Sequence, residues 1–169
     1  EDRIAHMEGG DACALFASGM AAISTAILAL CGKGDEIVST PALYGGSYRF
    51  FRDTLPHYGI HVQYADPRSL EDLLYLINPK TKVVYFETPT NPTLSLVDIA
   101  QLVKFTRRAE KEFRTSITII IDNTFATILN QNPFAFGVDV IMESATKYLG
   151  GHADIMAGVL IGKARFIKK

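Results

Sequence analysis

The sequence is poor in cysteine, and it has neither a long apolar run nor a dense cluster of basic residues. Its two cysteines, Cys13 and Cys31, are too few for a disulfide framework, which favours a reducing, cytoplasmic compartment. The formal net charge is −1, which argues against nucleic acid or an anionic membrane as the main partner. No stretch is long and apolar enough to span a bilayer, and no signal-peptide pattern follows Glu1. The chain therefore has the composition of one ordinary globular domain.

Nucleotide-binding and metal-binding patterns are missing too. No helix is expected to open on Gly-x-Gly-x-x-Gly or to begin with Gly-Lys-Ser/Thr, so a Rossmann dinucleotide domain is disfavoured. His57 and His61 have the spacing of two metal ligands on one helix face. Gly59 lies between them and would end such a helix, so we predict no metal site.

The sequence does alternate between short apolar segments, typical of strands, and longer helical segments. We expect strands at residues 12–17, 35–40, 59–65, 82–87, 116–121, from 138 to about 142, and at 157–161. We expect helices at residues 21–30, 48–58, 67–77 and 98–113. The helix at 21–30 is almost wholly apolar, so we expect it to be buried on all sides. This order predicts an α/β fold: a mostly parallel sheet with helices on both faces.

The segment from 138 to 151 is the strongest functional candidate. An apolar, β-branched run leads to Ser144, Thr146 and Lys147, followed by Gly150 and Gly151. We expect a lysine at the end of a buried strand to be partly desolvated, which lowers its pKa and makes its amine nucleophilic. These are the parts of a lysine Schiff-base site with an anionic group nearby. The alternative is that Lys147 is simply solvated.

Two further candidates precede helices. Residues 18–20, Ser-Gly-Met, lie between a strand and a helix, where free backbone N–H groups and the helix dipole favour an anion. They could form a phosphate cradle or an ordinary N-cap. Tyr44 stands beside two glycines and could lie flat on a ring, although packing is the commoner fate of a tyrosine.

Two more candidates follow central strands. Asn91 sits in a turn made rigid by Pro89 and Pro92, where it could hold a polar ligand atom or serve the turn itself. Asp122 ends the strand at 116–121, where a buried carboxylate is costly unless a cation meets it; otherwise it caps the next turn. Ligands bind at the carboxyl edge of open α/β sheets, so all these candidates should converge there.

Together the segments resemble the aspartate-aminotransferase fold type, fold type I, of pyridoxal 5′-phosphate (PLP) enzymes. More narrowly, they resemble the Cys/Met-metabolism family that includes cystathionine γ-synthase and γ-lyase. The resemblance covers nearly the whole chain and rests on five blocks in order, at residues 17–22, 44–47, 87–92, 122–126 and 144–152. It implies that residues 1–169 are the PLP-binding large domain of a longer chain, without the N-terminal arm and the C-terminal domain of the family. We therefore expect the isolated fragment to be inactive.

The resemblance implies three catalytic residues. Lys147 forms the Schiff base with PLP and later shuttles protons. Asp122 binds the pyridinium nitrogen and keeps it protonated. Tyr44 stacks on the ring, assists proton transfer and contacts the substrate. The remaining implied cofactor ligands are Gly19, Met20, Ser144 and Thr146 around the phosphate, Asn91 near the phenolic oxygen, and Thr124 supporting the ring.

Arg49 is the implied substrate-binding residue. Its setting resembles family members that handle cystathionine or O-succinylhomoserine, whose distal carboxylate an arginine can clamp. The alternative is a surface arginine paired with Asp53. Methionine γ-lyases typically carry Cys where this chain has Gly46, so they rank lower.

The resemblance thus implies γ-replacement or γ-elimination on sulfur amino acids or O-acylhomoserine. The within-family alternatives are an O-acetylhomoserine sulfhydrylase and a methionine γ-lyase, and the alternative of another class is a non-catalytic homologous domain. The implied partner is a small amino-acid substrate, with no nucleic acid or membrane. The full-length parent is implied to be a homo-oligomer, a dimer of dimers.

Overall fold

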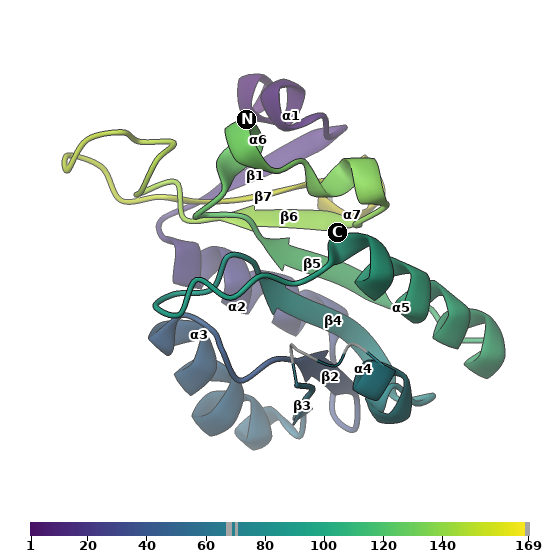
Figure 1. Ribbon diagram of the computed structural model, residues 1–169. Coiled ribbons are helices and arrows are strands. Elements are labelled where there is room, and N and C mark those ends of the chain that lie inside the picture. Colours follow the sequence, from purple (N-terminus) through teal and green to yellow (C-terminus); the bar gives the residue numbers. More distant parts are fainter. Residues whose placement is uncertain (67–68, 70, 168–169) are drawn as a thin grey trace.

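The computed structural model describes residues 1–66, 69 and 71–167 and has one mixed β-sheet at its centre (Figure 1). Within these residues the sheet has seven strands in the order β1-β7-β6-β5-β4-β2-β3. The strands are β1 (Ala12–Phe16), β2 (Glu36–Ser39), β3 (His61–Tyr64), β4 (Thr81–Glu87), β5 (Thr118–Asp122), β6 (Val140–Glu143) and β7 (Gly158–Gly162). The expected strands are therefore all present, with ends shifted by a few residues.

Helices cover both faces of the sheet, which confirms the expected α/β class. They are α1 (Asp2–Glu8), α2 (Gly19–Leu30), α3 (Gly45–Arg49), α4 (Glu71–Leu76), α5 (Ile99–Phe113), α6 (Thr127–Asn130) and α7 (Ala164–Ile167). A π-helical turn η1 (Phe50–Thr54) and the 3₁₀ turns η2 (Leu55–Tyr58) and η3 (Pro133–Phe136) complete them. In the described part of the chain, no helix is long and apolar enough to cross a membrane.

Strand direction places the loops that matter for function. Strands β3, β2, β4, β5 and β6 run parallel, whereas β7 runs antiparallel to both β6 and β1. The carboxyl ends of the parallel strands therefore meet at one edge. Figure 1 shows two long loops on that side, after β4 and after β6.

Alternation along the strands assigns side chains to opposite layers. Val83 and Tyr85 of β4 pack in the cluster with α2, whereas Val84 and Phe86 pack in the cluster with α4 and α5. A third cluster joins α1 to β1, β6 and β7 through residues such as Ile141. Each fully buried side chain of this kind contributes about 1.5–3 kcal/mol of transfer free energy.

Helix α2 has one buried side and one partly exposed side, although nearly all of its residues are apolar. Ser18 caps it, with its hydroxyl accepting a hydrogen bond from the Ala21 backbone N–H at 3.0 Å. Ile23 and Ile27 are buried against the sheet, but Leu28 is 39% exposed. The expectation that this helix is buried on all sides is therefore wrong, because the described chain places a layer against one of its sides only.

The helix expected at residues 48–58 is broken into three successive turns. It begins earlier, as α3 at Gly45, and then continues as η1 and η2. Pro56 lacks a backbone N–H and cannot extend an i→i−4 ladder, so the chain tightens there and ends at Gly59 with φ 70°. The helix expected from Pro67 lies partly outside the described residues, and its described part is α4.

Candidate active site

A cavity of about 290 Å³ opens at the carboxyl edge of the sheet, on the face covered by α2. It gathers residues from the start of α2, the loop before α3, the turn after β4, the end of β5 and the loop after β6. The predicted residues that line it are Gly19, Met20, Tyr44, Asn91, Asp122, Thr124, Ser144, Thr146 and Lys147.

Asp122 forms the charged floor of this cavity. It is the last residue of β5 and lies on the same face as Ile120, whose side chain packs towards α2. One carboxylate oxygen accepts hydrogen bonds from the Thr124 hydroxyl at 2.6 Å and the Thr124 N–H at 3.1 Å, and the other accepts from the Tyr85 hydroxyl at 3.3 Å. Burial raises the pKa of Asp122, and these hydrogen bonds oppose that rise.

The start of α2 offers backbone donors to the cavity. Gly19 and Met20 are the first two residues of this helix, so their N–H groups have no intrahelical acceptor. A Cβ on Gly19 would lie 3.0 Å from the Cβ of Ser144. The start of α2 and the Ser144 side chain are so close that any side chain at position 19 would crowd Ser144. These donors are therefore arranged as an anion site at a helix N-terminus would need.

Tyr44 stands at the mouth of the cavity and is 50% exposed. A Cβ on Gly46 would lie 2.6 Å from Cε1 of the Tyr44 ring and 2.9 Å from the Met20 sulfur. The ring of Tyr44 thus occupies space that only a glycine at position 46 leaves open.

Glu87 lines the cavity but was not among the predicted site residues. Its two carboxylate oxygens accept hydrogen bonds from the backbone N–H of Tyr44 at 2.6 Å and of Asn91 at 2.7 Å. It is register partner of Asp122 on the neighbouring strand. Burial, followed by the charge of Asp122, raises the pKa of Glu87 to about 7.

Lys147 projects from the loop after β6 and is exposed, four residues beyond the strand end at Glu143. The expected desolvation of Lys147 is therefore wrong for this chain, because the described residues leave it uncovered. Its backbone N–H donates to Ser144 O at 2.9 Å in a turn, and Lys147 lines the same cavity as Asp122.

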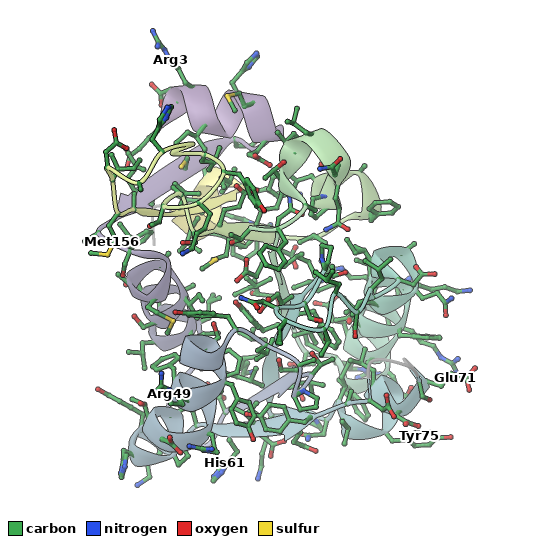
Figure 2. The ribbon with its side chains drawn as sticks, turned by 60° about the vertical axis from the view of Figure 1, so that its left-hand side comes forward. Arg3, Arg49, His61, Glu71, Tyr75 and Met156 are labelled. Carbon is green, nitrogen blue, oxygen red and sulfur yellow. The ribbon has the colours of Figure 1, made fainter. Side chains whose placement is uncertain are left out.

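Thr146 closes the base of the same loop. Its hydroxyl donates to Ala157 O at 3.0 Å and accepts from Ala157 N–H at 2.9 Å. The single hydroxyl proton of Thr146 is therefore already used, and donation to a ligand would require this bond to be exchanged. Figure 2 shows Met156, at the end of this loop, at the margin of the molecule.

Arg49 is the one predicted site residue that does not line the cavity. It is exposed on α3, and Figure 2 shows it on the same side of the molecule as Met156, lower in the view. Asp53, the partner considered from sequence, is instead bonded to Arg52, with Nε to Oδ1 at 2.6 Å.

Two carboxyl groups are buried on the other side of the site strands. Glu143 ends β6 on the face of Ile141, and Glu8 of α1 is fully buried with neither oxygen hydrogen-bonded in the described structure. Asn123 donates to Glu143 at 3.3 Å. Burial raises the pKa of Glu8 to about 7 and that of Glu143 to about 8.

Sequence reasoning also missed apolar lining residues, namely Ile23, Phe125, Met142 and Met156. Alternation along β6 could have found Met142, which shares its face with Val140. Glu87 had a signal as well, because it ends the expected strand at 82–87 as Asp122 follows the one at 116–121, but its partners are defined only by the folded loops.

Comparison with known proteins gives a family for the full length of this chain. The profile of the family described as "Cys/Met metabolism PLP-dependent enzyme" matches residues 1–169.

The similar curated proteins are all longer. An L-methionine gamma-lyase of Treponema denticola is 39% identical over 99% of this chain and 41% of its own length. A cystathionine gamma-synthase/O-acetylhomoserine (thiol)-lyase of Bacillus subtilis is 42% identical over 96% of this chain and 42% of its own length. The chain thus spans about two fifths of these relatives.

A similar solved structure is that of a cystathionine gamma-lyase from Lactobacillus plantarum complexed with L-serine. It has a TM-score of 0.89 and 39% identity, and the match covers 98% of this chain and 42% of that one. At this similarity the fold-type expectation is confirmed.

Proposed function

Because this chain belongs to the Cys/Met-metabolism family of PLP-dependent enzymes, we propose that the protein catalyses γ-replacement or γ-elimination on sulfur amino acids or O-acylhomoserine. The type is that of cystathionine γ-synthase or γ-lyase. One observation carries the proposal: nine residues from five separate segments, each singled out from sequence, line a single cavity.

The cavity fits PLP on the chemistry of its own groups. Asp122 is a buried carboxylate with three neutral donors and, among the described residues, no ion-paired cation. A protonated ring nitrogen would supply the missing positive charge. At the other end, the Gly19 and Met20 N–H groups suit a phosphate, and the Ser144 hydroxyl is not engaged with any described residue.

PLP, when bound, supplies an electron sink for the substrate carbon. Lys147 would hold the cofactor covalently through its amine and, once released, would move the proton of the substrate's α carbon. Asp122 would keep the ring nitrogen protonated, and Tyr44 would cover the ring and assist proton movement near the amine. Asn91 would contact the phenolic oxygen, while Thr124 holds the Asp122 carboxylate in place.

Thr146 is the one phosphate donor that would have to give up an existing hydrogen bond, since its hydroxyl donates to Ala157 O. We assign the phosphate mainly to Gly19, Met20 and Ser144, with Thr146 joining them if its hydroxyl turns.

Arg49 would recognise the distal carboxylate of the substrate. Arg49 is exposed on α3, and although its charge acts on Asp53, that carboxylate is already bonded to Arg52, so the Arg49 guanidinium would be able to turn towards a ligand. The O-acetylhomoserine sulfhydrylase and methionine γ-lyase alternatives draw support from the names of the relatives. The close fit of the Tyr44 ring over Gly46 favours ranking methionine γ-lyase behind, because a cysteine there would have to displace the ring.

We also propose that the whole protein is a cytoplasmic homo-oligomer and that residues 1–169 alone have little or no activity. Both cysteines are free and buried, which fits a reducing compartment. A non-catalytic domain is disfavoured because Lys147, Asp122 and Tyr44 all line the cavity.

Product analysis of the full-length protein tests the function. It should be loaded with PLP and given O-succinylhomoserine plus cysteine, cystathionine alone, O-acetylhomoserine plus sulfide, or methionine. Cystathionine formation or breakdown as the fastest reaction supports the proposal. Faster turnover of methionine or O-acetylhomoserine selects the corresponding alternative, and no turnover of any substrate favours the non-catalytic domain.

A further inference from the structure

Glu87 connects two segments, the loop before α3 and the turn after β4, which lie far apart in the sequence. It ends β4 with its side chain on the face of Val83 and Tyr85, the face that carries the cavity. It is only 6% exposed, and each of its carboxylate oxygens accepts one short backbone hydrogen bond.

One of these bonds holds the loop before α3. The Tyr44 N–H donates to Oε2 at 2.6 Å across a separation of 43 residues. Within residues 40–44 the other described hydrogen bonds, such as Thr40 Oγ1 to Ala42 O and Leu43 N–H to Pro41 O, stay inside the loop. Ser47, in the helix that follows, makes a side-chain hydrogen bond with Tyr85 of β4, whereas the bond to Glu87 ties the loop residue Tyr44 itself to that strand.

The other bond holds the turn after β4. Asn91 N–H donates to Oε1 at 2.7 Å. Farther on, this turn is closed by its own hydroxyls, with Thr90 Oγ1 accepting from Ser95 N–H and contacting Thr93 Oγ1 at 2.6 Å. The turn is thus a compact unit that Glu87 attaches to the cavity floor.

We propose that Glu87 is a positioning residue that clamps the Tyr44 loop and the Asn91 turn to the same point of β4. The importance of this clamp for catalysis rests on the proposed function, which gives Tyr44 and Asn91 roles at the cofactor. The clamp itself belongs to the protein without ligand. A carboxylate suits it because both oxygens accept, whereas an amide presents one acceptor and one donor.

Glu87→Gln tests the clamp without any activity measurement. In hydrogen–deuterium exchange of the full-length protein, one backbone amide should exchange about ten- to a hundredfold faster, namely that of Tyr44 or of Asn91, whichever faces the new side-chain nitrogen. This is the factor expected for losing one charge-assisted hydrogen bond. Fragments covering residues 42–48 and 90–94 report them, and Pro92 contributes no amide to the second fragment.

Glu36→Gln is the matched control. Glu36 starts β2 at the opposite edge of the sheet, and its carboxylate also accepts two side-chain donors, from Gln63 and Asn78. This variant should leave the exchange of Tyr44 and Asn91 unchanged. Unchanged exchange of both amides in Glu87→Gln, or faster exchange spread evenly over the sheet, would overturn the proposal.

If Glu87→Gln does not fold, the native protein supplies the test. Protonation of Glu87 removes one of its acceptors, so the protection of Tyr44 or Asn91 should fall as pH drops through about 7. The titratable groups facing Glu87 are Asp122 on β5, Tyr85 on its own strand, and Tyr44 and Lys147 across the cavity. The Thr124 amide, bonded to Asp122, reports that neighbour separately.

Protection of Tyr44 and Asn91 that stays constant with pH would also refute the clamp. Both measurements read amides of the protein whether or not PLP is bound. Their failure is therefore distinguishable from a failure of the proposed enzyme function, which would appear as absence of bound PLP or of products.

Discussion

At the scale of single residues, Asp122 shows how a buried charge can be prepared for a ligand. Thr124 and Tyr85 orient its carboxylate with hydrogen bonds, but neither contributes a positive charge. Such a group is tolerated more readily when a cation completes it.

Asp122→Asn should therefore allow PLP to enter but reduce turnover severely. The amide nitrogen would face the donors of Thr124 or Tyr85, and the ring nitrogen would lose its charged partner. Loss of such a buried charge pair costs on the order of 2–5 kcal/mol, at least about a thirtyfold loss in kcat. Steady-state kinetics measures it, with Asp98→Asn at the N-cap of α5 as the control. Near-normal turnover would contradict the assigned role.

Lys147 is expected to carry the cofactor covalently. Borohydride reduction of the PLP-loaded full-length protein, followed by peptide mass mapping, should place the label on Lys147 and nowhere in a Lys147→Ala variant. The physical reason is that Lys147 lines the same cavity as the cradle formed by Gly19 and Met20. A label on Lys33 or Lys104 instead would sink the assignment.

Arg49→Ala should lower kcat/KM about ten- to a hundredfold for cystathionine or O-succinylhomoserine, which carry a distal carboxylate. It should change little for O-acetylhomoserine, which has none. Arg52→Ala is the matched control, because Arg52 is already paired with Asp53. Equal losses on both kinds of substrate would mean that Arg49 is structural.

Site residues could be predicted from sequence where their place at the end of a strand identifies them. They could not be predicted where contacts between distant segments define their role. Asp122 was found because a carboxylate follows a β-branched strand. Glu87 also ends an apolar strand, but its role was not predicted because its partner Tyr44 lies 43 residues away. The exposure of Lys147 was missed because β6 ends at Glu143, as its apolar run suggests, and the four residues that follow carry Lys147 out into an exposed loop.

At the scale of secondary-structure elements, caps and long periodic segments were predictable. Asp98 accepts a hydrogen bond from Gln101 N–H at 2.9 Å and starts α5, as expected. Helices α6 and α7 were not predicted, because four residues are too few to establish a helical period. The segment at 48–58, expected to be one helix, is also divided into short turns, the last of which contains Pro56.

The Thr146 hydroxyl helps to close the base of the loop after β6, together with the backbone hydrogen bond from Thr146 N–H to Ala157 O at 3.0 Å. Thr146→Val should leave the Ala157 N–H without its acceptor and cost about 1–3 kcal/mol of local opening free energy. Limited proteolysis should then cut residues 147–156 faster, whereas Thr146→Ser should behave like the native protein. Equal cutting rates in Thr146→Val and the native chain would rule out this role of the hydroxyl.

At the scale of the whole molecule, sheet composition was predictable and strand order was not. The strand expected at 116–121 is β5 (Thr118–Asp122), which lies between β6 and β4 in the sheet and has all five residues buried. The antiparallel direction of β7 has no sequence signal, since an apolar strand reads the same either way. The convergence of the site residues at one edge followed from the parallel direction of the strands alone and did not require their order.

Buried carboxyls without cations should make stability depend on pH. The pKa of Glu8 is raised from its ordinary 4.5 to about 7, so the folded state holds a proton that the unfolded state releases. Its contribution is fully present below about pH 4.5 and is lost as pH rises towards 7, by on the order of 3 kcal/mol.

Glu8→Gln should therefore gain stability relative to the native protein as pH rises from 5 to 8. Urea unfolding at both pH values measures this, and Glu112→Gln on the exposed side of α5 is the control. A difference between Glu8→Gln and native that does not grow with pH would show that Glu8 is ionised in the folded protein.

Alternation on β5 and β6 also bears on how this chain can change over evolutionary time. Asp122 faces the cavity while Glu143 faces α1. In each strand the neighbouring residue points to the opposite face of the sheet. Deleting one residue within β5 would present Asn123 where the carboxylate belongs and would turn the residues between the deletion and the strand end to the opposite face. Descendants of this sequence can therefore accept many substitutions along these strands, but a gain or loss of a single residue there should be eliminated by selection.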